Sequence, residues 1–211
     1  MALEVARPPV TQLEVGDSLR MSARALDSSG EELPGAELWW VTPDTTVRVD
    51  SATGWVVPLR PGPGRVLARS GTLVSAPTSF SFLARADTLV LAYPADTTLP
   101  AGVTTSGPLG ARLESFDPAG PLAGRDLVLE VVDPLFADPG LRTVELSTGV
   151  LLDTLATGAT GGPASPVELR VVEGQAAPDS AVVEFRSARF RGAEPVPGSG
   201  QRTIIRFTPA P

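Results

Sequence analysis

Short alternating runs of hydrophobic and polar residues follow one another along the whole chain, separated by Gly, Pro or Asp. Over residues 13–27, for example, Leu19, Met21, Ala23 and Ala25 fall on one face of an extended segment. No stretch of ten or more residues has the 3.6-residue period of an amphipathic helix. Turn signals at intervals of about 8–12 residues are typical of a sandwich or barrel, so the pattern predicts an all-β protein.

The predicted strands form two series, and we place the boundary between them at residues 85–87. The first series gives a β-sandwich domain over residues 11–86. The second gives a larger β-sandwich over residues 87–211, ending in a strand and a short Pro tail. Residues 1–10 are expected to form an extended arm, because two consecutive prolines fix an extended backbone. The prediction is therefore two tandem β-sandwiches with extended terminal arms.

The composition agrees with many short strands and a packed interior. The 211 residues include 21 Gly and 22 Pro, a frequency of turn formers that does not suit long helices. Hydrophobic residues make up 42 %, which is enough to form a core and argues against a disordered chain.

Four residue types are absent from the chain: Cys, His, Lys and Asn. Their codons are A/T-rich, so a GC-rich genome explains the absence most simply. The absence still excludes a thiol nucleophile, an imidazole base, a lysine Schiff base and the usual zinc, copper and haem ligands. We therefore expect no cofactor, no metal site, no catalytic residue and no enzymatic activity.

The charge and hydropathy patterns limit the possible partners. A net charge of -7 argues against binding to nucleic acid, which needs a basic surface. No segment approaches the roughly 18 apolar residues of a membrane-spanning helix. The first residues, MALEVARPPV, lack the pattern of a signal peptide, so no export signal is visible.

An ordered set of short motifs between residues 10 and 85 carries a family resemblance. These motifs are Val15-Gly16-Asp17, Asp27–Gly30, Trp40, Thr42–Asp44, Val49-Asp50, Gly54 and the Pro61–Gly64 run. In this order they resemble a bacterial immunoglobulin-like domain of the second group. The turns at Leu99–Gly102 and Asp117–Gly120 resemble the first-group domains of invasin and intimin type, and this resemblance ends after Ala156. It implies immunoglobulin-like β-sandwiches, an extracytoplasmic location at the periplasm or cell surface, a structural or adhesive role, and no shared catalytic residues.

All three tryptophans lie between residues 38 and 56. The resemblance makes Trp40 a core residue, and strand alternation then turns Trp39 outward. By the same logic Trp55 points outward beside an inward Val56. The expected core positions are Trp40, Val49, Gly54 and Val56. Two outward tryptophans on one small domain would form an apolar patch for a partner; alternatively, the arm or the second domain covers them.

The segment EFRSARFRGAE places Arg186, Arg189 and Arg191 around Phe185 and Phe190. Arginine pairs with carboxylates and phosphates, so this segment is a candidate contact with acidic lipid headgroups or with an acidic protein face. The alternative is an ordinary solvated strand face on which Arg replaces the absent Lys.

Two functions are compatible with these expectations. The first is a non-enzymatic scaffold subunit, peripheral to a membrane, that holds together a larger envelope assembly such as a photosynthetic or respiratory complex. Its partners would be the protein subunits of that assembly, including subunits embedded in the membrane. The absence of an anchor, a sorting tail or a repeat array favours it. The alternative is an adhesin or filament module that binds a glycan, a host protein or a sister subunit, and the family resemblance favours that.

Overall fold

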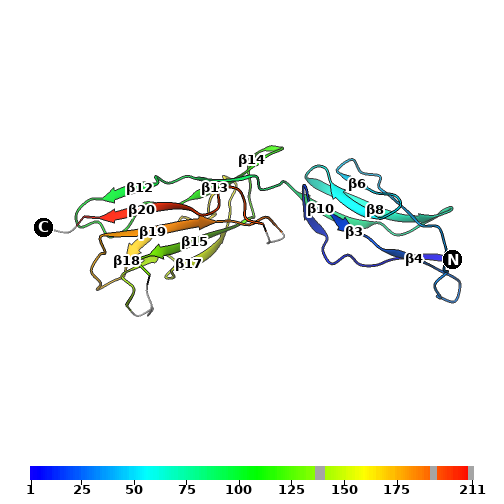
Figure 1. Cartoon of the computed structure of the whole chain (residues 1–211), viewed down its shortest axis with the longest axis horizontal. Coiled ribbons are helices and arrows are strands. Elements are labelled where there is room, and N and C mark those ends of the chain that lie inside the picture. The colour runs from blue at the N-terminus through cyan, green and yellow to red at the C-terminus, as the bar shows by residue number, and fades with distance from the viewer. Residues whose placement is uncertain (136–140, 191–193, 209–211) are drawn as a thin grey trace. The chain divides into compact units, whose positions relative to one another are not determined.

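The computed structural model describes residues 1–135, 141–190 and 194–208 of the chain. Within these ranges the regular elements are β-strands joined by turns and loops, so the fold is all-β. The chain divides into two compact units, Met1–Arg85 and Ala86–Pro211, here called unit 1 and unit 2 (Figure 1).

Unit 1 consists of two main sheets that face each other, and a strand pair at its beginning. The first main sheet has the order β2 (Gln12–Glu14), β10 (Thr78–Leu83), β8 (Gly62–Ser70), β5 (Trp39–Val41), and β9 (Leu73–Val74) forms a hairpin with β8. The second consists of β3 (Leu19–Arg20), β7 (Trp55–Pro58) and β6 (Val47–Val49). Because alternate residues of each strand point inward, both sheets contribute to one core. This core contains Leu13, Leu19, Met21, Trp40, Val47, Val56, Val66, Ala68, Phe80 and Phe82.

The first residues of the chain differ from the expected arm. Ala2–Val5 forms strand β1, which pairs antiparallel with β4 (Ala23–Leu26) over four residues. The segment is extended, as predicted, but it pairs with the edge of β4 and the side chains of Val5 and Val10 pack against the core, so residues 2–5 belong to the sandwich. The two prolines lie in the connection from β1 to β2.

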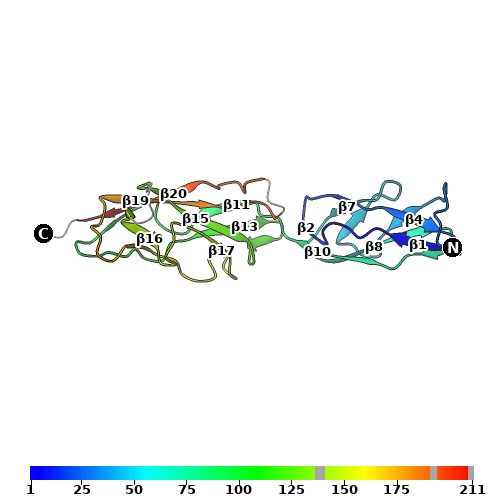
Figure 2. The same cartoon turned by 90° about the horizontal axis from the view of Figure 1, so that it is seen from below.

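Unit 2 is the larger sandwich, and Figure 2 shows its strands in two layers. One layer is a five-stranded sheet of β12 (Asp96–Leu99), β20 (Gln201–Phe207), β19 (Ser180–Arg186), β15 (Asp126–Asp133) and β17 (Leu152–Ala156), in that order. The other contains β11 (Thr88–Leu91), β13 (Ala111–Phe116) and β14 (Ala119–Pro121), together with the pair β16 (Val144–Leu146) and β18 (Leu169–Val171). The side chains of Leu113, Leu127, Leu129, Phe185 and Ile205 are fully buried between the layers.

In both units the last strand pairs parallel with an early strand of the same unit. In unit 1, β2 pairs parallel with the last strand, β10. In unit 2, β12 pairs parallel with the last strand, β20. The remaining strand pairs in both units are antiparallel. Two facing sheets with these connections form an immunoglobulin-like β-sandwich in each unit, as expected.

Candidate functional site

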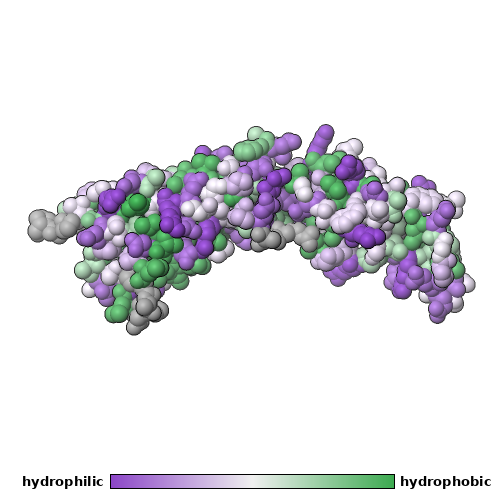
Figure 3. Space-filling model, viewed as in Figure 1, coloured by the Kyte–Doolittle hydropathy of each residue, from purple (hydrophilic) through white to green (hydrophobic). Residues whose placement is uncertain are grey.

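The outer face of the five-stranded sheet of unit 2 carries half-buried aliphatic side chains on three adjacent strands. Val182 on β19 is paired directly with Ile204 on β20. On the other side of β19, the register of β15 shifts between Val131 and Asp133, and the intervening Val132 is half-buried whereas Val131 is buried. We call Val132, Val182 and Ile204 the apolar band. Figure 3 shows hydrophobic residues crossing this face between hydrophilic residues on both sides.

Ion pairs border the apolar band on the side nearer the start of β20. There Glu184 on β19 accepts a bond from Arg202 on β20 at 2.7 Å, and Arg186 lies 3.7 Å from the same carboxylate. Arg186 also donates to Glu130 on β15. These contacts join three strands through their side chains.

A further ion pair borders the apolar band on its other side. Arg206, two residues after Ile204 on β20, contacts Asp96 on the edge strand β12 at 2.9 Å. This contact raises the pKa of the Arg206 guanidinium, first through the hydrogen bond from Arg206 to Asp96. The face is therefore an apolar centre between two charged margins, which is the usual anatomy of a protein interface.

The arginines that the sequence singled out do not form one exposed cationic cluster. Arg186 is 44 % exposed and is bound to Glu130. Arg189 is only 15 % exposed and lies 3.2 Å from a carboxylate oxygen of Glu194. Arg191 lies outside the described residues. The ion pairs neutralise Arg186 and Arg189 within the chain, which weakens the case for phosphate or lipid headgroups at this place.

Two hollows of about 390 and 270 Å³ lie beside these arginines. Arg186 lines the larger one, Arg189 and Phe190 line the smaller one, and Val128 and Ala188 belong to both. Val128 is paired with Arg186 across β15 and β19, so the larger hollow reaches the outer face of the sheet. The hollows therefore extend the surface that contains the apolar band.

The tryptophans of unit 1 lie on opposite sides of the sandwich. Trp40 is buried in the core and Trp39, its neighbour on β5, points away from the core and is half-buried. Trp55 is 44 % exposed beside the buried Val56 on β7. Because β5 and β7 belong to the two facing sheets, the expected single patch of Trp39 and Trp55 is wrong.

Gly54 explains how Trp40 fits in the core. Its φ of +75° lies in the left-handed region, which favours glycine. A Cβ atom at this position would lie 2.6 Å from Trp40 Nε1 and 2.8 Å from the carbonyl oxygen of Met21. The ring of Trp40 therefore occupies the space that only a glycine leaves open, while Val49 packs against the same core.

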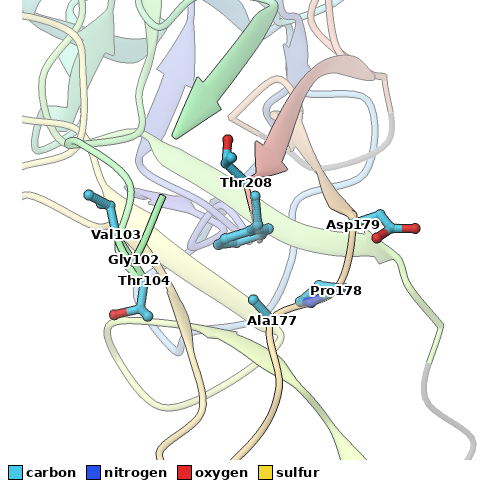
Figure 4. Close-up of a pocket in the computed structure, with 8 residues that line it drawn as sticks. Gly102, Val103, Thr104, Ala177, Pro178, Asp179 and Thr208 are labelled. Carbon is cyan, nitrogen blue, oxygen red and sulfur yellow. The ribbon is translucent and has the colours of Figure 1, made fainter. Parts of the chain in front are cut away.

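A hollow of about 290 Å³ at one end of unit 2 offers little chemistry. Figure 4 shows residues 102–104 on one side of it and residues 177–179 on the other, with Thr208 between them. Its only ionisable side chain is Asp179, and the carboxylate points away from residues 102–104 (Figure 4). One carboxylate without an adjacent base or acid does not form a catalytic pair.

The aspartates with perturbed pKa values stabilise turns or surface pairs. The pKa of Asp50 is lowered, first by a hydrogen bond from the hydroxyl of Thr53. The pKa of Asp27 is lowered in the same way by the serine two residues later. Arg65 donates two hydrogen bonds to Asp44, at 3.0 and 2.8 Å, and lowers the pKa of that carboxyl. A lowered pKa keeps each group ionised and makes it a poor general base.

Within the described ranges there is no group of three or more Asp, Glu, His or Cys side chains that could hold a metal ion. The same part of the chain contains no helix that is long and apolar enough to cross a membrane.

The apolar band was not predicted from the sequence, although the chain contains a signal for it. Each of its members is the outward half of an apolar doublet: Val131-Val132, Val182-Val183 and Ile204-Ile205. In a strand with one face in water, the outward residue of such a doublet is normally polar. Three doublets on three paired strands therefore mark an outer face that is unusually apolar.

Comparison with solved structures finds several similar chains. FdeC, described as an Escherichia coli adhesin, aligns with a TM-score of 0.54 and 15 % identity, covering 98 % of this chain and 64 % of the FdeC chain. The Yersinia pseudotuberculosis adhesin InvE aligns with a TM-score of 0.43 and 14 % identity, covering 98 % of this chain and 58 % of the other. Domains 4 and 5 of the S-layer protein SbsC align with a TM-score of 0.35 and 15 % identity, covering 99 % and 98 %.

No family model matches the chain, and no curated protein matches it either. At 15 % identity, the similarity to FdeC concerns the fold, and this chain spans less than two thirds of the FdeC chain. The fold is thus shared with a bacterial adhesin, whereas the assignment of either unit to a particular group of bacterial immunoglobulin-like domains rests on the motifs alone.

Proposed function

We propose that the chain is a non-enzymatic interaction module that works outside the cytoplasm and binds another protein through the outer face of the five-stranded sheet of unit 2. The observation that carries this proposal is the apolar band, which crosses three strands between two groups of ion pairs. Aliphatic side chains at the centre and charged side chains at the rim are what a protein interface needs. Water covers such a face less favourably than another protein does.

The residues of the chain also support a binding role rather than catalysis. Arg is the only basic side chain, and it stays charged throughout the physiological range. The aspartates with perturbed pKa values are more acidic than usual. No side chain in the sequence has an ordinary pKa near neutrality at which it could exchange a proton.

Of the two surface roles, an adhesive or filament-forming module is the better supported. The fold is similar to that of FdeC, described as an adhesin, and the motifs of unit 1 resemble a bacterial immunoglobulin-like domain of the second group. Unit 2 would correspondingly be a domain of invasin or intimin type. Acidic lipid is a weaker candidate partner, because Arg186 and Arg189 already pair with Glu130 and Glu194.

The experiment is gentle detergent extraction of the native envelope, followed by sizing, for the wild type, Val182→Arg and a control. The control, Arg112→Glu, reverses a charge that is 51 % exposed on β13, a strand of the opposite layer. We expect the wild type and the control in the envelope fraction, in a species larger than the 21.8 kDa chain. Val182→Arg should migrate as the free chain, because a charge in the apolar band opposes docking.

Four results would change this conclusion. A wild-type chain found in the cytoplasm would refute the location. A wild-type chain found only free, or a large species that Val182→Arg leaves intact, would refute the role of the sheet face. Stoichiometric co-migration with integral membrane subunits would favour the scaffold subunit over the adhesive module.

A further inference from the structure

The two strands that flank β19 carry opposite charges on their outward sides, basic on β20 and acidic on β15. The outward residues of β20 are Arg202, Ile204 and Arg206, and those near the end of β15 are Glu130, Val132 and Asp133. The register places Arg202 and Glu130 at the level of Glu184, and Ile204 and Asp133 at the level of Val182. At the level of Glu184 the face is thus basic on the β20 side and acidic on the β15 side. At the level of Val182 it has Ile204 on one side and the bulged pair Val132-Asp133 on the other.

A two-fold rotation about an axis that runs parallel to β19, above the outer face, exchanges these two sides. Because β20 and β15 are both hydrogen-bonded to β19, each lies about 4.8 Å from it, on opposite sides. When two copies face each other across this axis, β20 of each copy lies over β15 of the other. Arg202, which pairs with Glu184 in its own chain, then lies over Glu130 of the second copy, which pairs with Arg186, so these ion pairs join across the contact. Ile204 lies over the bulged pair Val132-Asp133 of the second copy.

The remaining contacts follow from the same rotation. Asp133 is exposed and has no ion pair within the described residues, and it lies at the level of Val182. Arg206 lies two residues further along, at the level of Ser180, so it is beside Asp133 of the second copy rather than directly over it. Val182 lies on the axis and meets its own counterpart, which completes the apolar centre. We propose that this face binds a second copy of the chain, in a parallel two-fold arrangement about β19. The proposal rests on the proposed function and names its partner.

The axis also brings the two copies of Glu184 together, which costs energy unless their charges are neutralised. Within each copy, Arg202 at 2.7 Å and Arg186 at 3.7 Å surround that carboxylate. These guanidinium groups offset the repulsion between the two carboxylates, because each carboxylate already has opposite charge beside it.

The charges select the parallel arrangement over the antiparallel one. A two-fold axis across the strands, through the level of Val182, would place Arg202 over Arg206 of the second copy. The same axis would place Asp133, which lies at the level of Val182, over Asp133 of the second copy. Like charges would then meet on both sides of the apolar band, and like-charge contacts in an interface cost several kcal/mol.

The size of the face sets the strength of the association. The five strands have 4, 7, 7, 8 and 5 residues, and at about 3.3 Å per residue and about 4.8 Å between strands they cover roughly 490 Å² for each copy. A standard stable interface buries about 800 Å² on each partner. We therefore expect a weak dimer whose population depends on concentration in the micromolar range.

The first test is sedimentation velocity of the whole purified chain over concentrations from about 1 to 500 μM. The wild type and Arg112→Glu should shift toward a dimer at the upper end. Val182→Arg should remain monomeric, because it places two like charges on the axis. Its side chain is half-exposed in the monomer, so the fold should tolerate the change, and its far-UV circular dichroism should match the wild type.

The second test uses two charge reversals that disable each chain alone. If the Arg202→Glu variant associated with itself, two pairs of acidic side chains would face each other across the contact. If the Glu130→Arg variant did so, two pairs of basic side chains would face each other. Mixed at equal concentration, the two variants present opposite charges at both contacts, so the mixture should dimerise as the wild type does. A general folding defect in either variant would not produce this recovery.

Each other outcome overturns the proposal. A monomeric wild type at every concentration, a dimer that tolerates Val182→Arg, or a mixture that stays monomeric contradicts the two-fold contact. Stronger self-association of Arg202→Glu would indicate the antiparallel arrangement. If the wild type is monomeric in solution but Val182→Arg still releases it from the native envelope, the second copy is wrong as the partner, whereas the proposed function stands.

Discussion

Replacing Gly54 with alanine tests how closely the core of unit 1 is fitted around Trp40. The variant requires an alanine at a φ of +75°, which costs about 1–2 kcal/mol. The new Cβ also meets Trp40 Nε1 at 2.6 Å and the Met21 carbonyl oxygen at 2.8 Å. Forcing a methyl group into a packed core costs about 1–3 kcal/mol more. We expect unit 1 to lose about 2–5 kcal/mol of unfolding free energy in total.

Gly30 provides the matched control for this variant. Its φ of +87° is also left-handed, but a Cβ there would have no atom within 4 Å. Gly30→Ala therefore has the backbone strain without the collision, and we expect it to cost only about 1–2 kcal/mol.

The assay is urea unfolding followed by tryptophan fluorescence. All three tryptophans lie in unit 1, so the signal reports unit 1 even though the chain has two units. In a Trp40→Phe background the smaller ring leaves more room, so part of the Gly54→Ala cost should disappear in a double-mutant cycle. If Gly54→Ala costs no more than Gly30→Ala, the packing of Trp40 against Gly54 does not limit the core as described.

Three further predictions concern acid stability, a buried hydroxyl and an exposed indole. The folded pKa values of three aspartates of unit 1 lie below the ordinary 3.8, so their ionised forms stabilise unit 1 above that pH, and this contribution is lost as the pH falls through the folded values. The urea midpoint measured by fluorescence should thus fall between about pH 5 and pH 2.5, and Asp50→Asn should reduce the fall; an unchanged midpoint would contradict it. Thr157, 3 % exposed, accepts a bond from the Arg125 amide at 3.0 Å and donates to the Leu122 carbonyl at 2.6 Å. Thr157→Val should therefore cost unit 2 about 1–3 kcal/mol by circular dichroism; a loss no larger than that of exposed Thr154→Val would argue against it. Trp55→Ser should change stability by less than about 1 kcal/mol and remove most of the acrylamide-accessible fluorescence, because this indole is 44 % exposed; quenching that persists would place the exposed indole elsewhere.

The fold was predictable from the sequence because it depends on local patterns. Alternation of apolar and polar residues identifies strands, and the frequent Gly and Pro mark the turns between them. Alternation also places Trp40 and Val56 inward and Trp55 outward, as they lie in the structure. None of these predictions requires knowledge of which strands pair with each other.

The features that the sequence could not predict all depend on that pairing. Trp39 and Trp55 lie on opposite faces because β5 pairs with β8, whereas β7 pairs with β3 and β6. The N-terminal strand β1 is extended, as its composition suggests, but its partner β4 begins some twenty residues later.

The ion pairs of the candidate site also depend on strand pairing and could not be predicted from the sequence. The sequence around Arg186 does not reveal that its side chain is ion-paired, because its partner Glu130 lies 56 positions away. The apolar doublets were visible along the chain, but only the register shows that Val182 and Ile204 lie side by side. The interaction face is thus a property of the assembled sheet.

The most direct test of the central claim is photo-crosslinking from the apolar band in intact cells of the source organism. A photoreactive amino acid replaces Ile204 in one variant and Arg112, on the opposite layer, in another. If the outer face of the five-stranded sheet is the interaction surface, position 204 should give a discrete crosslinked protein, of twice the chain mass if the partner is a second copy, and position 112 should give none. A crosslink from position 112 alone, or from neither position, would contradict the claim.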